Sequence, residues 1–322
     1  MKIAYIGGLW SRNIGNSFYN IGTDCFLKKI GFTDVYFIPD PPQWECSSVI
    51  GDFDLIGNLE VDVVLLTGPC LNLRLESIYG KIFNKLKLRN IPFGFLSAGM
   101  SLYDIGEAEQ VRKCLEVYPP SFIFTRDDLT ASLLRSAKIP NVFEGICMSM
   151  YLNEAIKLPK LDIPEYIVLN FDLEEPVLVG NNVNGFKSLK RTWINRNKFP
   201  EEINGLKVIR TRNDSITIGE QKIYARNNTY HSDLPYGYLS ILKNAKLVLS
   251  ERVHTCAATT ILGSEAQYIP HSSRSLEKRM SLFNKVGLNE ISSRPQKIQF
   301  DIVNSEKSRL ESTFSSMFPP LK

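Results

Sequence analysis

The stretch KLVLSERVHTCAATTILGSEAQYIP, residues 246–270, contains an apolar run, a run of small residues and a second apolar run. Residues 246–252 and 266–270 are short enough to be strands, whereas residues 254–263 have the length and the small side chains of a helix that lies close to a sheet. A strand, a helix and another strand in this order predict parallel strands, because a parallel neighbour is reached only by a long connection across the sheet face. This stretch therefore predicts a parallel α/β fold.

The same alternation runs through the first 150 residues and begins again near residue 165. We expect strands at residues 2–8, 34–40, 61–68, 91–100, 121–128 and 141–148, and then at 165–173, 206–212, 246–252 and 266–270. The connecting stretch 151–164 carries two prolines and little apolar periodicity, as in a linker. The sequence predicts two doubly wound, Rossmann-like α/β domains, residues 1–155 and 156–322, with a cleft between the carboxyl ends of their sheets.

Composition excludes several classes of protein. The net charge of the 322 residues is only +4 and is dispersed, which argues against a nucleic-acid partner, although an anionic substrate or membrane surface stays compatible with it. The first residues lack the long apolar region of a signal peptide, and no apolar run reaches membrane-spanning length, so we expect a cytoplasmic protein. Six cysteines without a CxxC pair and three histidines without ligand spacing predict small core thiols and no metal site.

Two polar residues stand at the carboxyl end of the strand expected at 246–252. If the extended conformation persists, Arg252 and His254 leave the same face, and the helix that follows offers unpaired N–H groups in its first turn. Arginine, imidazole and a helix N-terminus together suit a doubly charged anion such as a phosphate ester. The alternative is a surface pair between Arg252 and Glu251, with His254 capping the helix.

These residues resemble a motif of the polysaccharide pyruvyl transferase family, in which a strand ends in S-x-R-x-H and a glycine closes the small-residue helix. The matching residues are Ser250, Arg252, His254 and Gly263. Other stretches that resemble the family follow the expected strands in the same order: SRNIGNSFYNIG (11–22), LLTGPCLN (65–72), SAGMS (97–101) and TRDDLTASLL (125–134). The resemblance covers roughly residues 1–290.

The resemblance implies a GT-B-like architecture and a pyruvyl transferase. The pyruvyl group would pass from phosphoenolpyruvate, the donor, to a sugar of a cell-surface polysaccharide or its lipid-linked precursor, forming a ketal without any cofactor. The second domain would hold the donor through Ser250, Arg252 and His254, with His254 either protonating the methylene carbon or contacting the phosphate. Arg126 would add a second cation from the first domain; a salt bridge with Asp127 or Asp128 is its alternative.

The first domain would hold the acceptor through the loop after its first strand. Asn13, Gly15 and Asn16 are the candidates, because an open loop can present backbone N–H groups and amide side chains to sugar hydroxyls. The alternative is a turn in which Gly15 supplies a positive φ angle. Asp24 and Asp104 are candidate bases near strand ends, and nothing in the sequence selects between them.

Two other functions stay open. A GT-B glycosyltransferase would bind a nucleotide sugar with the same anion site, and a non-catalytic sugar-binding relative would not need His254. The oligomeric state is undetermined, and peripheral association with the inner face of a membrane is compatible with the charge. We expect residues 301–318 to form a helix that docks through Phe314, Met317 and Phe318 on the core of the protein itself.

Overall fold

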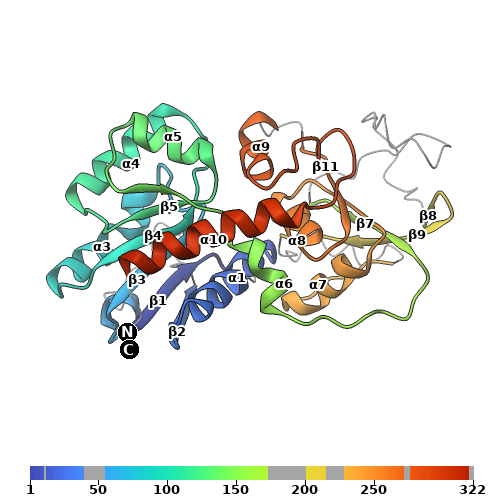
Figure 1. Cartoon of the computed structure of the whole chain (residues 1–322), viewed down its shortest axis with the longest axis horizontal. Coiled ribbons are helices and arrows are strands. Elements are labelled where there is room, and N and C mark those ends of the chain that lie inside the picture. Colours follow the sequence, from blue (N-terminus) through green and yellow to red (C-terminus); the bar gives the residue numbers. More distant parts are fainter. Residues whose placement is uncertain (11, 40–54, 173–200, 215–227, 272–275, 319–322) are drawn as a thin grey trace. The chain divides into compact units, whose positions relative to one another are not determined.

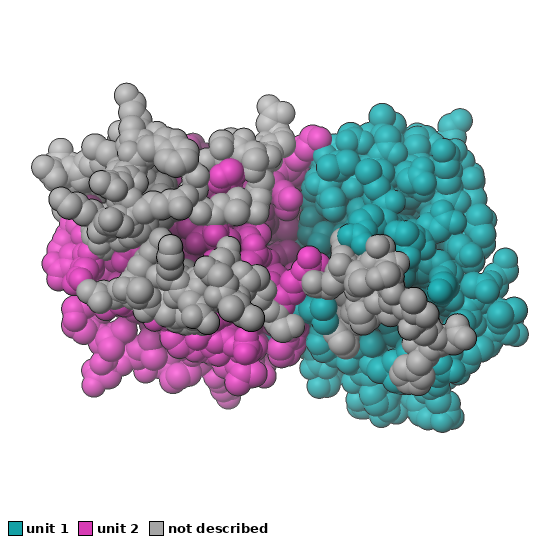
Figure 2. Space-filling view, turned by 180° about the vertical axis from the view of Figure 1, so that it is seen from behind, with its two compact units in different colours: residues 1–9, 19–151, 301–322 teal, residues 10–18, 152–300 magenta. Residues whose placement is uncertain are grey.

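The computed structural model describes residues 1–10, 12–39, 55–172, 201–214, 228–271 and 276–318 (Figure 1). Its contacts divide the chain into two compact units (Figure 2). Unit 1 comprises residues 1–9, 19–151 and 301–322, and unit 2 comprises residues 10–18 and 152–300. Each unit has its own parallel sheet with helices, which confirms the predicted fold class of two Rossmann-like α/β domains.

The sheet of unit 1 has the strand order β2-β1-β3-β4-β5-β6, and neighbouring strands are parallel. The strands are β1 (Lys2–Gly7), β2 (Asp34–Pro39), β3 (Val63–Gly68), β4 (Phe93–Ala98), β5 (Ile123–Thr125) and β6 (Val142–Glu144). All residues of β3, β4 and β5 are buried, as expected for parallel strands with helices on both faces. The strand order reverses between β1 and β3, which is the switch point of this sheet.

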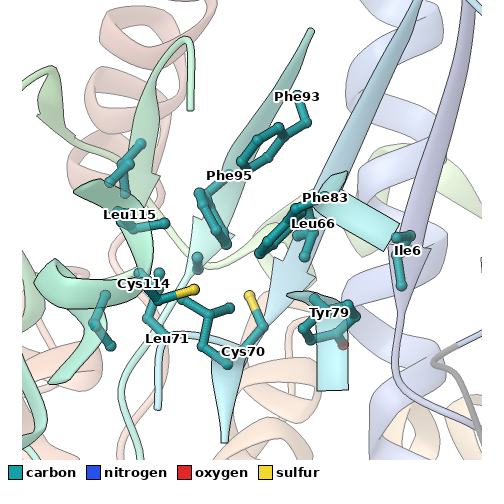
Figure 3. Close-up of a cluster of buried hydrophobic side chains, with 14 of the residues drawn as sticks. Ile6, Leu66, Cys70, Leu71, Tyr79, Phe83, Phe93, Phe95, Cys114 and Leu115 are labelled. Carbon is teal, nitrogen blue, oxygen red and sulfur yellow. The ribbon is translucent and has the colours of Figure 1, made fainter. Parts of the chain in front are cut away.

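One face of this sheet is covered by consecutive helices. They are α2 (Leu55–Asn58), α3 (Leu75–Leu88), α4 (Ile105–Val117) and α5 (Asp128–Ser136). The buried residues of α3 recur every three or four positions, so that one stripe of the helix faces the sheet. Figure 3 shows this core, in which Tyr79 and Phe83 of α3 lie near Leu66 and Phe95 of the strands.

Helix α1 (Gly15–Lys29) and the last helix, α10 (Phe300–Met317), supply a second aromatic cluster in unit 1. The ring of Phe314 in α10 lies 5.4 Å from that of Phe26 in α1 and 5.5 Å from that of Phe122 beside β5, measured between centroids. Phe314 is 1% exposed. The expected terminal helix is therefore present and docks on the protein's own core. Because α10 packs against unit 1, the end of the chain does not join residues 156–300 as the predicted boundary assumes.

The sheet of unit 2 has the order β11-β10-β7-β9-β8, and only β8 is antiparallel to its neighbour. Its strands are β7 (Tyr166–Asn170), β8 (Glu202–Ile203), β9 (Leu206–Thr211), β10 (Leu247–Ser250) and β11 (Glu265–Tyr268). Its helices are α6 (Leu152–Ala155), which directly follows the 3₁₀ turn Met148–Tyr151 of unit 1, α7 (Pro235–Asn244), α8 (Val253–Ile261) and α9 (Leu276–Asn284). The sequence also predicts a helix over residues 183–197, which lie outside the described residues.

Helix α8 packs closely on β10 and β11 because its buried face is made of small residues. Ala257 and Ala258 are fully buried there. Gly263 ends the helix with a φ angle of 96°, and the next residue, Ser264, donates its N–H to the carbonyl of Thr259. This is a left-handed glycine cap, which explains why the small-residue stretch closes with glycine.

Candidate functional site

Tyr19 occupies the switch-point crevice of unit 1. Its hydroxyl accepts a hydrogen bond of 3.1 Å from the backbone N–H of Gly8, which follows β1. A Cβ atom on Gly68, at the end of β3, would lie 2.7 Å from the same hydroxyl. The place where open α/β sheets usually bind ligands is thus filled by the chain itself in this unit.

The switch point of unit 2, between β7 and β10, is lined by polar side chains. Ser250 Oγ donates to Asn170 Oδ1 at 2.7 Å, which joins the ends of β10 and β7. The amide nitrogen of Asn170 donates to Thr211 Oγ1 and to Asn213 Oδ1, both at 2.9 Å. Each of the three strands therefore ends in a polar residue of one buried network. Such a network needs every partner in place, so it holds the carboxyl edge rigidly.

Asp172 is the centre of this edge. Its carboxylate is 1% exposed and accepts the backbone N–H groups of Asn213 and Asp214 at 2.7 and 2.9 Å. The same carboxylate forms ion pairs with Arg252 and with Arg212, whose Nε lies 3.6 Å away. One buried acid thus orders the turn after β9 and orients two arginines.

Arg252 is held by two carboxylates. Its Nε donates to Asp172 and its Nη2 to Asp214, while Nη1 has no hydrogen-bond partner among the described residues. Burial acts to lower the pKa of Arg252, but Asp172 and Asp214 outweigh it and raise the pKa, so the guanidinium stays charged. The alternative pair with Glu251 is not its main contact, because Glu251 Oε1 accepts the backbone N–H of Asp172 at 2.9 Å.

The turn from β10 to α8 differs from the extended course considered above. The strand ends at Ser250 and the helix begins at Val253, with Arg252 in an extended N-cap conformation. His254 is therefore the second residue of α8, and the prediction that Arg252 and His254 share a strand face is wrong. The helix starts early because Ser250 Oγ accepts the N–H of Arg252 at 2.9 Å and bends the chain. Ser250 itself is fully buried and supports the turn.

The loop predicted to bind the acceptor is part of unit 2. Asn13 Nδ2 donates to Asp214 Oδ1 at 2.7 Å, and the N–H of Ile14 donates to the carbonyl of Asn213 at 2.8 Å. The backbone N–H of Asn16 donates to the carbonyl of Asn13 at 2.9 Å. The predicted split at residue 155 assigned this loop to the first domain, whereas its hydrogen bonds join it to the turn after β9.

Gly15 is required by close packing. It is the first residue of α1, so the positive φ angle considered as its alternative is wrong. A Cβ atom there would lie 2.7 Å from Asn213 Nδ2 and 2.9 Å from Asn13 Oδ1. The glycine thus lets the loop lie directly on the polar network.

Asp214 connects the loop to Arg252. One carboxylate oxygen accepts from Asn13 and the other from Arg252, and the side chain is 39% exposed. Burial and the neighbouring Asp172 raise the pKa of Asp214, whereas Arg252 and Asn13 act to lower it. This acid is the partner of Arg252 that solvent reaches.

Arg126 is a buried residue of unit 1. It is 4% exposed, and its Nη2 donates to Tyr103 Oη at 2.7 Å and to the carbonyl of Met100 at 3.2 Å. Burial acts to lower the pKa of Arg126, but Tyr103 and Asp127 raise it above its ordinary value. Asp127 is also the N-cap of α5, accepting the N–H of Thr130 at 2.8 Å. The salt bridge weighed as the alternative for Arg126 is thus present, with 3.5 Å between Arg126 Nε and Asp127 Oδ2.

The other candidate acids have local partners. Asp104 is the N-cap of α4 and accepts the N–H of Glu107 at 2.8 Å. Asp24 lies inside α1 and pairs with Lys28 at 2.7 Å. Each therefore has a structural role in unit 1.

Sequence reasoning missed several residues of the edge in unit 2: Asn170, Asp172, Arg212, Asn213 and Asp214. Their signal is positional, since each lies in the last few residues of an expected strand or just after it, as Arg252 does. Isolated acids and amides are common at such places, so only the register of β7, β9 and β10 shows that they meet.

Within the described residues, no group of three or more histidine, cysteine, aspartate or glutamate side chains is arranged to hold a metal ion. In the same part of the chain, no helix is long and apolar enough to cross a membrane.

Comparison with known proteins places this architecture. A sequence model of the polysaccharide pyruvyl transferase family matches residues 13–266. No curated protein matches the chain in sequence.

Several solved structures share the fold at low sequence identity. A putative UDP-N-acetylglucosamine 2-epimerase from Listeria monocytogenes aligns over 100% of this chain and 97% of its own, with a TM-score of 0.57 and 11% identity. The S. aureus MnaA-UDP co-structure aligns over 96% and 88% with a TM-score of 0.55 and 13% identity. UDP-GlcNAc 2-epimerase from Neisseria meningitidis, bound to UDP-GlcNAc, aligns over 98% and 100%, with a TM-score of 0.53 and 12% identity. These likenesses establish the GT-B-type fold alone.

Proposed function

We propose that this chain, which belongs to the polysaccharide pyruvyl transferase family, transfers the pyruvyl group of phosphoenolpyruvate to two hydroxyls of a saccharide and forms a ketal. The observation that carries the proposal is Arg252, a permanently charged guanidinium at the switch point of unit 2 with one nitrogen, Nη1, unused by the described residues. A guanidinium is well suited to phosphate and carboxylate groups, and phosphoenolpyruvate carries both.

The first turn of α8 supports the same role. Its N–H groups and its dipole favour an anion beside Arg252, which is the N-cap. His254 lies in this turn, where an imidazole can change its protonation state near neutral pH. In the proposal Arg252 neutralises the donor, and His254 gives a proton to C3 of the enol or contacts the phosphate.

The two carboxylates that contact Arg252 differ in whether a donor anion can replace them. Asp172 is buried and fixed by two backbone N–H groups, so it stays in place and aims the guanidinium. Asp214 is more exposed and competes with the donor for the same cation. In the proposal the donor anion displaces Asp214, and Asn13 and its loop respond because they share that carboxylate.

Ligand-dependent thermal unfolding tests the donor. A ligand that binds only the folded state at 100 times its Kd stabilises the protein by about 2.7 kcal/mol. We expect such a shift with phosphoenolpyruvate and none with UDP-GlcNAc. Phosphoenolpyruvate together with a saccharide acceptor should also release inorganic phosphate, visible by ³¹P NMR.

Arg252→Lys is the informative variant. Lysine keeps the positive charge but cannot contact both Asp172 and Asp214 in the planar geometry of arginine, so the shift with phosphoenolpyruvate should be lost. Arg112→Lys is the matched control, since Arg112 pairs with Glu109 and Glu116 along α4 of unit 1. A shift with UDP-GlcNAc alone would refute the proposal in favour of a nucleotide-sugar enzyme.

A further inference from the structure

His231 lies on the same carboxyl edge as the arginines, although nothing in the sequence connects it to them. A short parallel bridge pairs Arg210 of β9 with Thr229, with the N–H of Tyr230 donating to the carbonyl of Arg210 at 2.8 Å. Continued by two residues, this register places His231 beside Arg212. By the register of β7 with β9, Asp172 belongs to the same end of the sheet.

The hydroxyl of Tyr238 contacts this histidine and two backbone groups near it. Tyr238, in α7, donates its hydroxyl proton to the carbonyl of Arg212 at 3.0 Å and accepts the N–H of Ser232 at 3.3 Å. His231 Nδ1 lies 2.5 Å from the same hydroxyl. A phenol has a single proton, and when that proton goes to the carbonyl of Arg212, Nδ1 is the donor to the hydroxyl. In the neutral ring, Nε2 then carries the basic lone pair.

The charges around His231 favour that neutral ring. Burial and the positive charge of Arg212 lower the pKa of His231, and burial has the larger effect. The negative charges of Asp233 and Asp172 act to raise this pKa. The net effect is a pKa below the ordinary value. The imidazole is therefore a base that is unprotonated at neutral pH and held in one orientation by Tyr238.

We propose that His231 is the general base that removes the proton from the acceptor hydroxyl in pyruvyl transfer. The inference rests on the proposed function, since it needs the donor to bind at Arg252 and the acceptor to approach the same edge of unit 2. It gives the reaction the base that neither Asp24 nor Asp104 supplies, because each of those has a local structural role.

The first acceptor oxygen bonds to C2 of phosphoenolpyruvate as its proton moves to Nε2 of His231, and C3 takes a proton from His254 to become a methyl group. The second acceptor oxygen then bonds to C2 while the bond from C2 to the phosphate oxygen breaks. Of the two acceptor protons, one is balanced by the new methyl proton and the other leaves with the phosphate.

Nitrogen NMR tests the geometry directly. The chain has only three histidines, so ¹⁵N-histidine labelling gives three rings, and His231→Asn identifies the signals of His231. We expect the free protein to show Nδ1 protonated and Nε2 bare at pH 7. Phosphoenolpyruvate should raise the pKa of His231, because the donor brings negative charge to this edge.

Kinetics separates a catalytic from a structural role. In His231→Asn, the amide nitrogen can still donate to Tyr238 where Nδ1 did, but no base remains. We expect phosphoenolpyruvate to bind as before and kcat to fall at least about 100-fold, with the loss of the acidic limb in the pH profile of kcat/KM. The matched control, His271→Asn, should keep both the rate and the limb.

The outcomes are distinguishable. Binding of phosphoenolpyruvate without any change at His231, or full activity of His231→Asn, would overturn this inference and leave the proposed function standing. A protein that binds no phosphoenolpyruvate would overturn the proposed function and the inference together. A ring with bare Nδ1 would overturn the inference whatever the ligand does.

Discussion

Replacing Asp214 by asparagine should tighten the binding of phosphoenolpyruvate. The substitution keeps an oxygen that accepts the hydrogen bond of Asn13 and removes the negative charge that competes for Arg252. Asp172 still holds the guanidinium through its Nε, so Arg252 should stay oriented. The donor would then displace a neutral amide from Nη2 instead of a carboxylate.

The size of the expected gain in binding free energy depends on how exposed the ion pair of Asp214 and Arg252 is. Two unit charges at about 4 Å attract by about 4 kcal/mol at an effective dielectric constant of about 20. Asp214 is 39% exposed, and exposed pairs are worth only about 0–1 kcal/mol after screening and side-chain ordering. We expect the upper end of that range, about 1 kcal/mol, because Arg252 is only 15% exposed, and this corresponds to about fivefold tighter binding.

Isothermal titration with phosphoenolpyruvate at several pH values measures this effect. Because burial and Asp172 raise the pKa of Asp214, the wild-type acid becomes neutral as the pH falls through that raised pKa, and it stops competing. The tighter binding of phosphoenolpyruvate by Asp214→Asn, relative to the wild type, should thus be complete above this pKa and disappear below it. By the same sign, the charged form of Asp214 costs folding stability, so the wild type should lose stability as pH rises through this window.

Asp62→Asn is the control, since Asp62 is an exposed acid directly before β3 in unit 1. Weaker binding by a folded Asp214→Asn variant would show that Asp214 is part of the donor site. An unchanged Kd across the pH range would show that it is no competitor. Either result would refute the exchange of Asp214 for the donor anion.

Two further predictions concern packing. Phe314→Ala should destabilise the protein by about 3–5 kcal/mol in urea unfolding because it opens a cavity in the aromatic cluster of unit 1, whereas the 43% exposed Phe300→Ala in the same helix should change it by less than about 0.5 kcal/mol. Gly15→Ala should cost about 1–3 kcal/mol and weaken phosphoenolpyruvate binding, because its Cβ would lie 2.7 Å from an amide nitrogen of the polar network. Gly80→Ala, with only a side-chain carbon at 3.5 Å, should be neutral or stabilising; equal effects of the two glycine changes would contradict this explanation.

The two units use the same topology in different ways. In unit 1 the crevice at the switch point is filled by Tyr19, and the buried Arg126 donates a hydrogen bond to Tyr103 in the loop after β4. In unit 2 the corresponding edge collects acids, amides and arginines in one network. The fold-level rule about where ligands bind thus points to two places, and the described side chains at these two places differ in chemistry.

Local sequence patterns were enough to predict the elements. Apolar periodicity and glycine or proline breaks act over a few residues, so the parallel fold and the terminal helix were expected from them, whereas the glycine that closes α8 was implied by the family resemblance. The motif around Arg252 was recognised for the same reason, since its residues lie within one turn of the chain.

The surroundings of Arg252 were decided by tertiary structure. Its two carboxylate partners lie 80 and 38 residues away in sequence, and Asn13 reaches Asp214 across 201 residues. Only the pairing of β7 with β9 and β10, and the seating of the first loop on that edge, bring these groups together. Contacts of this kind depend on strand register and on packing, which no local pattern specifies, and they place Arg252 between one buried and one partly exposed carboxylate.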